Sequence, residues 1–188
     1  WNQAMLALTS AQYQAAQAQL QARVEDQAHT ASLEQAEDFA AKPPAVILDV
    51  DETVLDNSPY QARVIEEGLR FPEGWDDWCK QSAAGAVPGA LAFTRFAVEQ
   101  GVYVFYVTNR DASLEEATRK NLVAAGFPVA QEIDAVLMAN EREDWTSDKT
   151  SRRQHLAENY RIVMLFGDNL GDFVGKDAAK GKPEARAE

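Results

Sequence analysis

Three short apolar runs, separated by segments with helical character, constrain most strongly what this chain can fold into. They are AVILDV, VYVFYV and RIVMLF, at residues 45–50, 102–107 and 161–166. Runs this short and rich in β-branched and aromatic residues are typical of strands buried on both faces of a parallel sheet. Parallel strands need long crossover connections, which are usually helices. We therefore expect an α/β fold with a Rossmann-like core, in which a mainly parallel sheet is flanked by helices.

The segments between the runs supply the expected helices and one further strand. Residues 88–101 begin with Pro and end with Gly, as helices often do. Residues 113–128 carry a capping-box pattern, Ser113 with Glu116, and end in Gly-Phe-Pro. The short apolar run at 134–139 predicts a strand, and a helix is expected after Lys149.

The N-terminal segment predicts a helical extension. Residues 1–41 are rich in Ala and Gln, and Lys42-Pro43-Pro44 should end any helix. We divide the chain into this extension (1–41) and a core domain (42–188). The extension either packs on the core or forms a coiled-coil arm of a homodimer. Its apolar face recurs at helical spacing, at Leu6, Thr9, Tyr13, Ala16, Leu20 and Val24.

Charge excludes some partners. The chain has 18 Lys and Arg against 30 Asp and Glu, a net charge of −12. Because nucleic-acid backbones and anionic membranes attract basic surfaces, this balance argues against both as partners. The one cysteine, Cys79, can form no internal disulfide and is expected to be a small buried side chain.

Polar side chains follow each predicted strand. Asp49, Asp51 and Glu52 come with the first, Thr108 and Asn109 with the second, and Asp168 and Asp172 after the third. The carboxyl ends of parallel strands meet at one edge of a sheet, where ligands of such folds bind. The carboxylates should therefore converge there, although they are far apart in sequence.

Converging carboxylates repel one another and need a counter-charge. Oxygen ligands without nearby His or Cys favour Mg²⁺ over zinc. Mg²⁺ commonly shares its coordination sphere with phosphate oxygens, so a phosphate ester is the natural substrate class. Lys149, in the stretch Ser-Asp-Lys-Thr-Ser, is the best candidate for a lysine that binds the phosphate.

The order of these motifs resembles a known family. Four short motifs lie at predicted strand or helix ends and look like the four motifs of haloacid-dehalogenase-like (HAD) phosphatases. They are DVDET, VTN, a single Lys and GDNLGD. The finer resemblance is to class C bacterial acid phosphatases of the lipoprotein 5′-nucleotidase type, through LDVDETVLDNSPY, AVPGA, FYVTNR, DKTSR and GDNLGDF. It covers residues 45 to about 173.

The resemblance implies roles for the candidate residues. Asp49 would be the nucleophile that forms an aspartyl-phosphate, and Asp51 the general acid and base. Mg²⁺ would be held by Asp49, Asp168 and the backbone carbonyl of Asp51. The phosphate-binding residues would be Thr108, Asn109 and Lys149, with Asp172 supporting them.

The implied activity is Mg²⁺-dependent hydrolysis of small phosphate monoesters, nucleoside monophosphates among them. The alternatives are a non-catalytic phosphate- or Mg²⁺-binding storage protein on the same fold, and a phosphotransferase. Tyr60, Trp75 and Trp78 are candidates for stacking on a base or aromatic leaving group, or else belong to the core.

The resemblance also implies a location. The expected cellular location is the periplasm, the outer membrane or the exterior of a bacterium. Any lipid anchor would lie on a segment that precedes Trp1. The polar tail at 175–188 is expected to be truncated or disordered, because the family continues there with a further strand.

Overall fold

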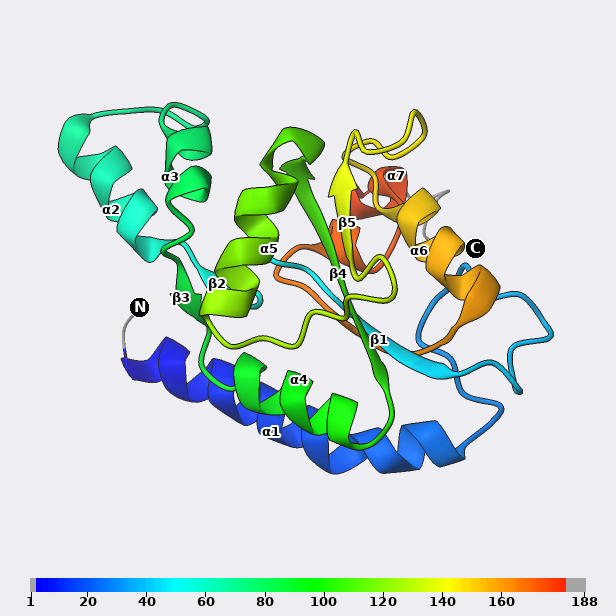
Figure 1. Ribbon diagram of the computed structural model, residues 1–188. Helices are drawn as coiled ribbons and strands as arrows, with labels where there is room; N and C mark the ends of the chain where they lie inside the picture. The colour runs from blue at the N-terminus through cyan, green and yellow to red at the C-terminus, as the bar shows by residue number, and fades with distance from the viewer. Residues whose placement is uncertain (1–2, 182–188) are drawn as a thin grey trace.

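The centre of the molecule is a parallel four-stranded sheet. The computed structural model describes residues 3–181, and its strands lie in the order β5-β4-β1-β6 (Figure 1). Each neighbouring pair is parallel. This arrangement confirms the predicted α/β class. The strands are β1 (Pro44–Leu48), β4 (Tyr103–Asp111), β5 (Val136–Ala139) and β6 (Arg161–Phe166).

The central strands are apolar on both faces because both faces are covered. In β1, Val46 and Leu48 belong to one core cluster, whereas Ala45 and Ile47 belong to the other. This alternation follows from the two-residue period of a strand. It explains why the first and second apolar runs lack the polar alternation of a half-exposed sheet.

Helices α1 (Gln3–Glu25), α4 (Ala90–Glu99) and α5 (Glu115–Ala124) cover one face of the sheet, and α6 (Thr150–Asn159) covers the other. Figure 1 shows α1 and α4 side by side. Gly89 permits their approach, since a Cβ there would lie 2.9 Å from the Cβ of Tyr13, and its φ of +91° disfavours other residues. Tyr13 and Leu20 on the predicted apolar face of α1 are buried against the core.

The N-terminal helix is shorter than expected, because it ends at Glu25 and not near Lys42. The guanidinium of Arg161 donates hydrogen bonds to backbone carbonyls at the end of this helix. Nη2 donates to Val24 O at 2.5 Å, and Nη1 donates to Asp26 O at 2.7 Å. Ala28 N then donates to the Asp26 carboxylate, which forms a turn. Residues 26–43 are irregular and lie along β6, where Ala31 N donates to Ile162 O. A domain boundary at 41/42 stays a prediction.

A small insertion separates β1 from α4. Strands β2 (Leu55–Asp56) and β3 (Gly85–Ala86) pair antiparallel at its base, and helices α2 (Ser58–Glu67) and α3 (Trp75–Gln81) lie between them in sequence. Helix α3 packs against α5. Cys79 on α3 is buried, as predicted.

Two local expectations need correction or limitation. The Ser113–Glu116 capping box does not form, because the carboxylate of Asp111 accepts from both the N–H and the hydroxyl of Ser113, so that α5 begins at Glu115 after a 3₁₀ turn. The tail predicted to be truncated or disordered is helical at α7 (Lys176–Ala179), and residues 182–188 lie outside the described residues. Among residues 3–181, no helix combines the length and the apolar character needed to cross a lipid bilayer.

Candidate active site

The acidic residues converge at the carboxyl edge of the sheet. Asp49 follows β1 directly, and its N–H donates to Phe166 O at 2.9 Å, which ties it to the end of β6. Asp168 and Asp172 follow β6. One carboxylate oxygen from each of Asp49, Asp168 and Asp172 lies within 4.8 Å of the others. The structure therefore brings together residues more than a hundred positions apart.

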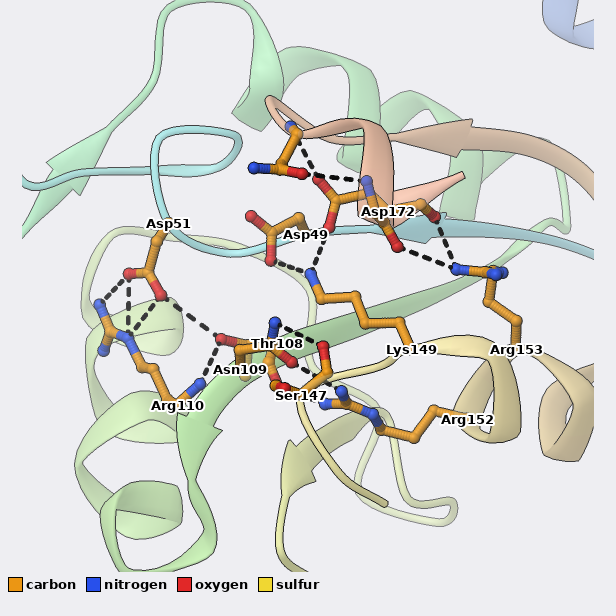
Figure 2. Close-up of polar contacts among 12 residues, drawn as sticks. Asp49, Asp51, Thr108, Asn109, Arg110, Ser147, Lys149, Arg152, Arg153 and Asp172 are labelled. Carbon is orange, nitrogen blue, oxygen red and sulfur yellow. Dashed lines mark hydrogen bonds and ion pairs between the residues drawn. The ribbon is translucent and has the colours of Figure 1, made fainter. Parts of the chain in front are cut away.

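Lys149 lies between two of these carboxylates. Its Nζ is 2.5 Å from Asp49 Oδ1 and 2.6 Å from Asp172 Oδ1 (Figure 2). All three side chains are buried. Lys149 precedes the first residue of α6, so the packing of that helix on the sheet sets the position of its ammonium group.

Asp172 is held in place from two sides. Its Oδ2 accepts from Asn169 N at 3.0 Å in a short 3₁₀ turn, Leu170–Asp172. A Cβ on Gly167 would lie 2.2 Å from the same oxygen, so only glycine leaves room for the carboxylate. Arg153, which is buried and paired with Glu34 at 2.6 Å, donates to the backbone carbonyl of Asp172 at 3.1 Å.

Asp51 lies apart from this cluster and has its own partners. Arg110 donates to Oδ1 through Nη2 at 2.8 Å and through Nε at 3.0 Å (Figure 2). Asn57 donates to the same oxygen at 2.9 Å. The hydroxyl of Thr108 lies 3.4 Å from Oδ2. These contacts hold the carboxylate, which remains 22% exposed.

The two predicted phosphate-binding residues of β4 lie in different environments. Asn109 is exposed and lines the cavity beside Asp49, with Arg152 Nη2 donating to its Oδ1 at 2.7 Å. Thr108 is fully buried beneath Asp51. Arg152 also donates to the backbone carbonyl of Thr108, so it fixes this end of the strand. Phosphate binding by Thr108 stays a prediction, because its hydroxyl is directed at Asp51 here.

A cavity of about 440 Å³ opens over the cluster. Its lining includes the predicted site residues Asp49, Asp51, Asn109, Lys149 and Asp168. Four further polar residues also line it, namely Ser147, Asp148, Lys176 and Lys180. Lys176 Nζ donates to the Ser147 hydroxyl at 2.6 Å, so α7 and the loop before α6 close one side.

None of the three aromatic candidates lines this cavity within the described part of the chain. Tyr60 is 1% exposed and donates its hydroxyl to Glu73 O. The Trp75 ring packs edge-on to Tyr60, and Trp78 Nε1 donates to Asn57 Oδ1 at 2.8 Å. Trp78 and Trp75 contact Asn57 and Arg110, two residues that hold Asp51, and stacking of any of the three rings on a substrate stays a prediction.

The electrostatics of the cluster favour a cation. Burial raises the pKa of Asp49 well above its usual value, and Asp172 and Asp51 raise it further, while Lys149 opposes them. Desolvation and then the charge of Asp172 raise the pKa of Asp168. The single positive charge of Lys149 does not balance the negative charges of Asp49, Asp168 and Asp172. The donors are all carboxylate oxygens, so the site fits a hard divalent cation.

Sequence reasoning did not predict the buried side chains that support the site, among them Asn57, Arg110, Arg152 and Arg153. Arg110 directly follows the Thr108-Asn109 motif, and the two Arg residues directly follow Lys149-Thr150-Ser151, so adjacency to a motif was the available signal. Adjacency does not distinguish an arginine that points to the site from one on the surface. Nothing in the local sequence marks Asn57.

Comparison with known proteins identifies the family and supports the fold. A family model of HAD superfamily subfamily IIIB (acid phosphatase) matches residues 2–186. The crystal structure of the class C acid phosphatase from Bacillus anthracis with tungstate bound superimposes with a TM-score of 0.79 at 34% identity. That match covers 100% of this chain and 75% of the Bacillus chain.

Two curated plant proteins match a shorter part. Acid phosphatase 1 from Solanum lycopersicum is 30% identical over 132 residues, and the stem 31 kDa glycoprotein from Glycine max is 28% identical over 133 residues. Each alignment covers 69% of this chain, and 51% and 52% of the respective relatives. The aligned region thus spans about half the length of these relatives.

Proposed function

The chain belongs to subfamily IIIB of the HAD superfamily, the acid phosphatases, and from this premise we propose that it hydrolyses small phosphate monoesters through an aspartyl-phosphate on Asp49. The observation that supports this most directly is the buried contact of Asp49 with Lys149, beside Asp168 and Asp172. A carboxylate that is held in this way and opens to a cavity is a good candidate for a nucleophile.

In the first step, an oxygen of Asp49 attacks the phosphorus atom of the ester. The bond between phosphorus and the alcohol oxygen breaks, and its electron pair stays on that oxygen, which takes a proton from Asp51. Lys149 holds the attacking carboxylate and offsets negative charge. Asn109, which lines the same cavity, is the candidate hydrogen-bond donor to the phosphoryl group.

In the second step, water attacks the phosphorus atom of the aspartyl-phosphate. Asp51, now deprotonated, accepts a proton from that water, and the bond between phosphorus and Asp49 breaks. Inorganic phosphate leaves and both aspartates return to their starting states. The two residues lie in separate environments, since Asp49 contacts Lys149 whereas Asp51 contacts Arg110.

Asp49, Asp168 and the backbone carbonyl of Asp51 would hold Mg²⁺. When bound, the metal would stabilise the charge that develops on the phosphoryl oxygens. The oxygen-only donor set and the raised pKa values of Asp49 and Asp168 support a hard cation at this position.

Nucleoside monophosphates are the proposed natural substrates. The class C acid phosphatase that superimposes on the whole chain supports the phosphatase class, and its tungstate-bound structure supports an oxyanion site in that protein. We extend the proposal to a location outside the cytoplasm, which the glycoprotein relative supports.

The test is a phosphomonoester panel with Mg²⁺, comparing the wild type with Asp49→Asn. The wild type should release phosphate, and EDTA should stop the release until Mg²⁺ is restored. Brief incubation with a ³²P-labelled substrate should leave an acyl-phosphate on the protein that hydroxylamine removes. Hydrolysis by Asp49→Asn at the wild-type rate would show that the mechanism is wrong.

The same panel separates the alternatives. A storage or binding protein would bind phosphate or Mg²⁺ in calorimetry without turnover. A phosphotransferase would release more alcohol than inorganic phosphate when glycerol is added as an acceptor.

A further inference from the structure

Arg110 is enclosed on all sides by groups that fix its orientation. It lies near the end of β4, and its side chain is 0% exposed. Nη1 donates to Thr118 Oγ1 at 3.3 Å on α5, and the guanidinium carbon lies 5.5 Å from the centre of the Trp75 ring on α3. Nε and Nη2 both face Asp51. The guanidinium therefore has one orientation, set by three elements.

Asn57 is the second residue that supports Asp51. It is fully buried, and its amide donates to Asp51 Oδ1 at 2.9 Å. The indole of Trp78 donates to its Oδ1 at 2.8 Å, which fixes the direction of the amide. Two donors, one charged and one neutral, thus converge on a single oxygen of Asp51.

This arrangement cannot serve direct substrate binding. A side chain with no exposed surface does not reach a phosphate ester in the cavity, and neither Arg110 nor Asn57 is among the residues that line it. Asp51 is the group through which both can act, because it lines the cavity and contacts both of them.

We infer that Arg110 and Asn57 are positioning residues that hold the side chain of Asp51 where it can protonate the leaving alcohol. The inference rests on the proposed function. The contribution of the two residues to the rate should therefore increase with the basicity of the departing alkoxide, because a more basic alkoxide depends more on protonation. An aryl oxide that is already stable leaves with little help, whereas an alkyl oxide does not.

Leaving-group dependence provides the test. We would measure kcat/KM for p-nitrophenyl phosphate, substituted phenyl phosphates and an alkyl phosphate such as glycerol phosphate. This constant reports the steps up to departure of the alcohol, so it is insensitive to later hydrolysis of the intermediate. Arg110→Lys keeps the charge and loses the two-pronged contact, and Asn57→Ala removes the second donor.

Each variant should lose at least about 10-fold more kcat/KM on the alkyl phosphate than on p-nitrophenyl phosphate, part of the 10²–10⁴-fold that a general acid supplies. The matched control is Arg161→Lys, a buried arginine at the opposite end of the sheet, which should affect all substrates equally. Equal loss on all substrates by folded Arg110→Lys and Asn57→Ala would overturn the inference. If Arg110→Lys does not fold, Asn57→Ala decides alone.

Asp51→Asn separates this failure from that of the proposed function. A wild type inactive on every ester, or an Asp51→Asn variant without leaving-group selectivity, would contradict the proposed mechanism itself. A selective Asp51→Asn with unselective Arg110→Lys and Asn57→Ala would contradict only the positioning role.

Discussion

The ammonium group of Lys149 lies 2.5 Å from Oδ1 of Asp49, a residue one hundred positions earlier in the chain. Both side chains are buried, and Asp172 takes a second contact from the same nitrogen at 2.6 Å. One ammonium group thus pairs with two carboxylates. Asp49 follows β1, and Asp172 follows β6. Removal of Lys149 would leave both acids without their counter-charge in a poorly hydrated place.

Lys149→Met should nearly abolish turnover while the protein stays folded. Without the ammonium group, Asp49 and Asp172 repel each other, so that the attacking oxygen is neither held nor screened. We expect a fall in kcat of about 10²–10³-fold, the size seen when one charge-stabilising donor is lost. The exposed Lys120→Met is the control and should retain wild-type kcat. Comparable activity of the two variants would refute this role.

Gly167→Ala should impair the enzyme through Asp172. The new Cβ would lie 2.2 Å from the carboxylate oxygen, so the side chain must move and its contact with Lys149 should weaken. We expect kcat for p-nitrophenyl phosphate to fall about 10-fold or more. Gly171→Ala meets its nearest atom only at 3.4 Å and is the matched control. If both alanines behave alike, close packing at Gly167 is not what positions Asp172.

Without metal, the charge on Asp49 should destabilise the fold as pH rises. Its pKa is raised by burial from 3.8 to about 7. A raised carboxyl pKa favours the folded state below the unfolded value, and this advantage is lost as pH rises towards the folded value. In EDTA, the melting temperature of Asp49→Asn minus that of the wild type should therefore increase between pH 4 and 7.

Mg²⁺ should shrink or reverse this difference at pH 7, since only the wild type carries the full ligand set. Calorimetric melts of both proteins, with EDTA and with Mg²⁺, give the four values needed. A difference that is independent of pH in EDTA would contradict the prediction.

Arg152→Lys should weaken phosphate binding more than it slows chemistry. Arg152 orients the amide of Asn109 and binds the carbonyl of Thr108, and lysine cannot make both contacts at once. We expect KM and the inhibition constant of inorganic phosphate to rise about 10-fold, as for loss of one charge-assisted hydrogen bond. Steady-state kinetics with phosphate as a competitive inhibitor measures both. A changed kcat with unchanged KM would argue for a different role.

Leu20→Ala should destabilise the protein, because α1 is part of the core. Leu20 is fully buried between α1 and the sheet. We expect a loss of about 2–5 kcal/mol in the free energy of unfolding, typical of a buried Leu→Ala change. Leu8→Ala, at a position that is 52% exposed, should cost far less in the same urea titrations. Equal losses would mean that α1 does not contribute to the core as the contacts indicate.

The class of fold and the acidic edge of the sheet could be predicted from the amino-acid sequence. The apolar runs specify strands buried on both faces, and parallel connection places Asp49, Asp168 and Asp172 together, whatever the loops do. These signals are local and periodic, so they can be read from the chain alone. Lys149 could be predicted as well, because it lies at the start of a helix that must cover the sheet.

Which arginines support the site, and where the first helix ends, depends on the packing of segments that are distant in sequence. Arg110 faces Asp51 because α5 and α3 enclose it, and Arg161 ends α1 because β6 brings its guanidinium to Val24 and Asp26. The tertiary structure also brings Trp78 to Asn57 and Trp75 to Arg110. A long side chain can point in many directions from one backbone position, and the packing of distant segments selects the one that is seen.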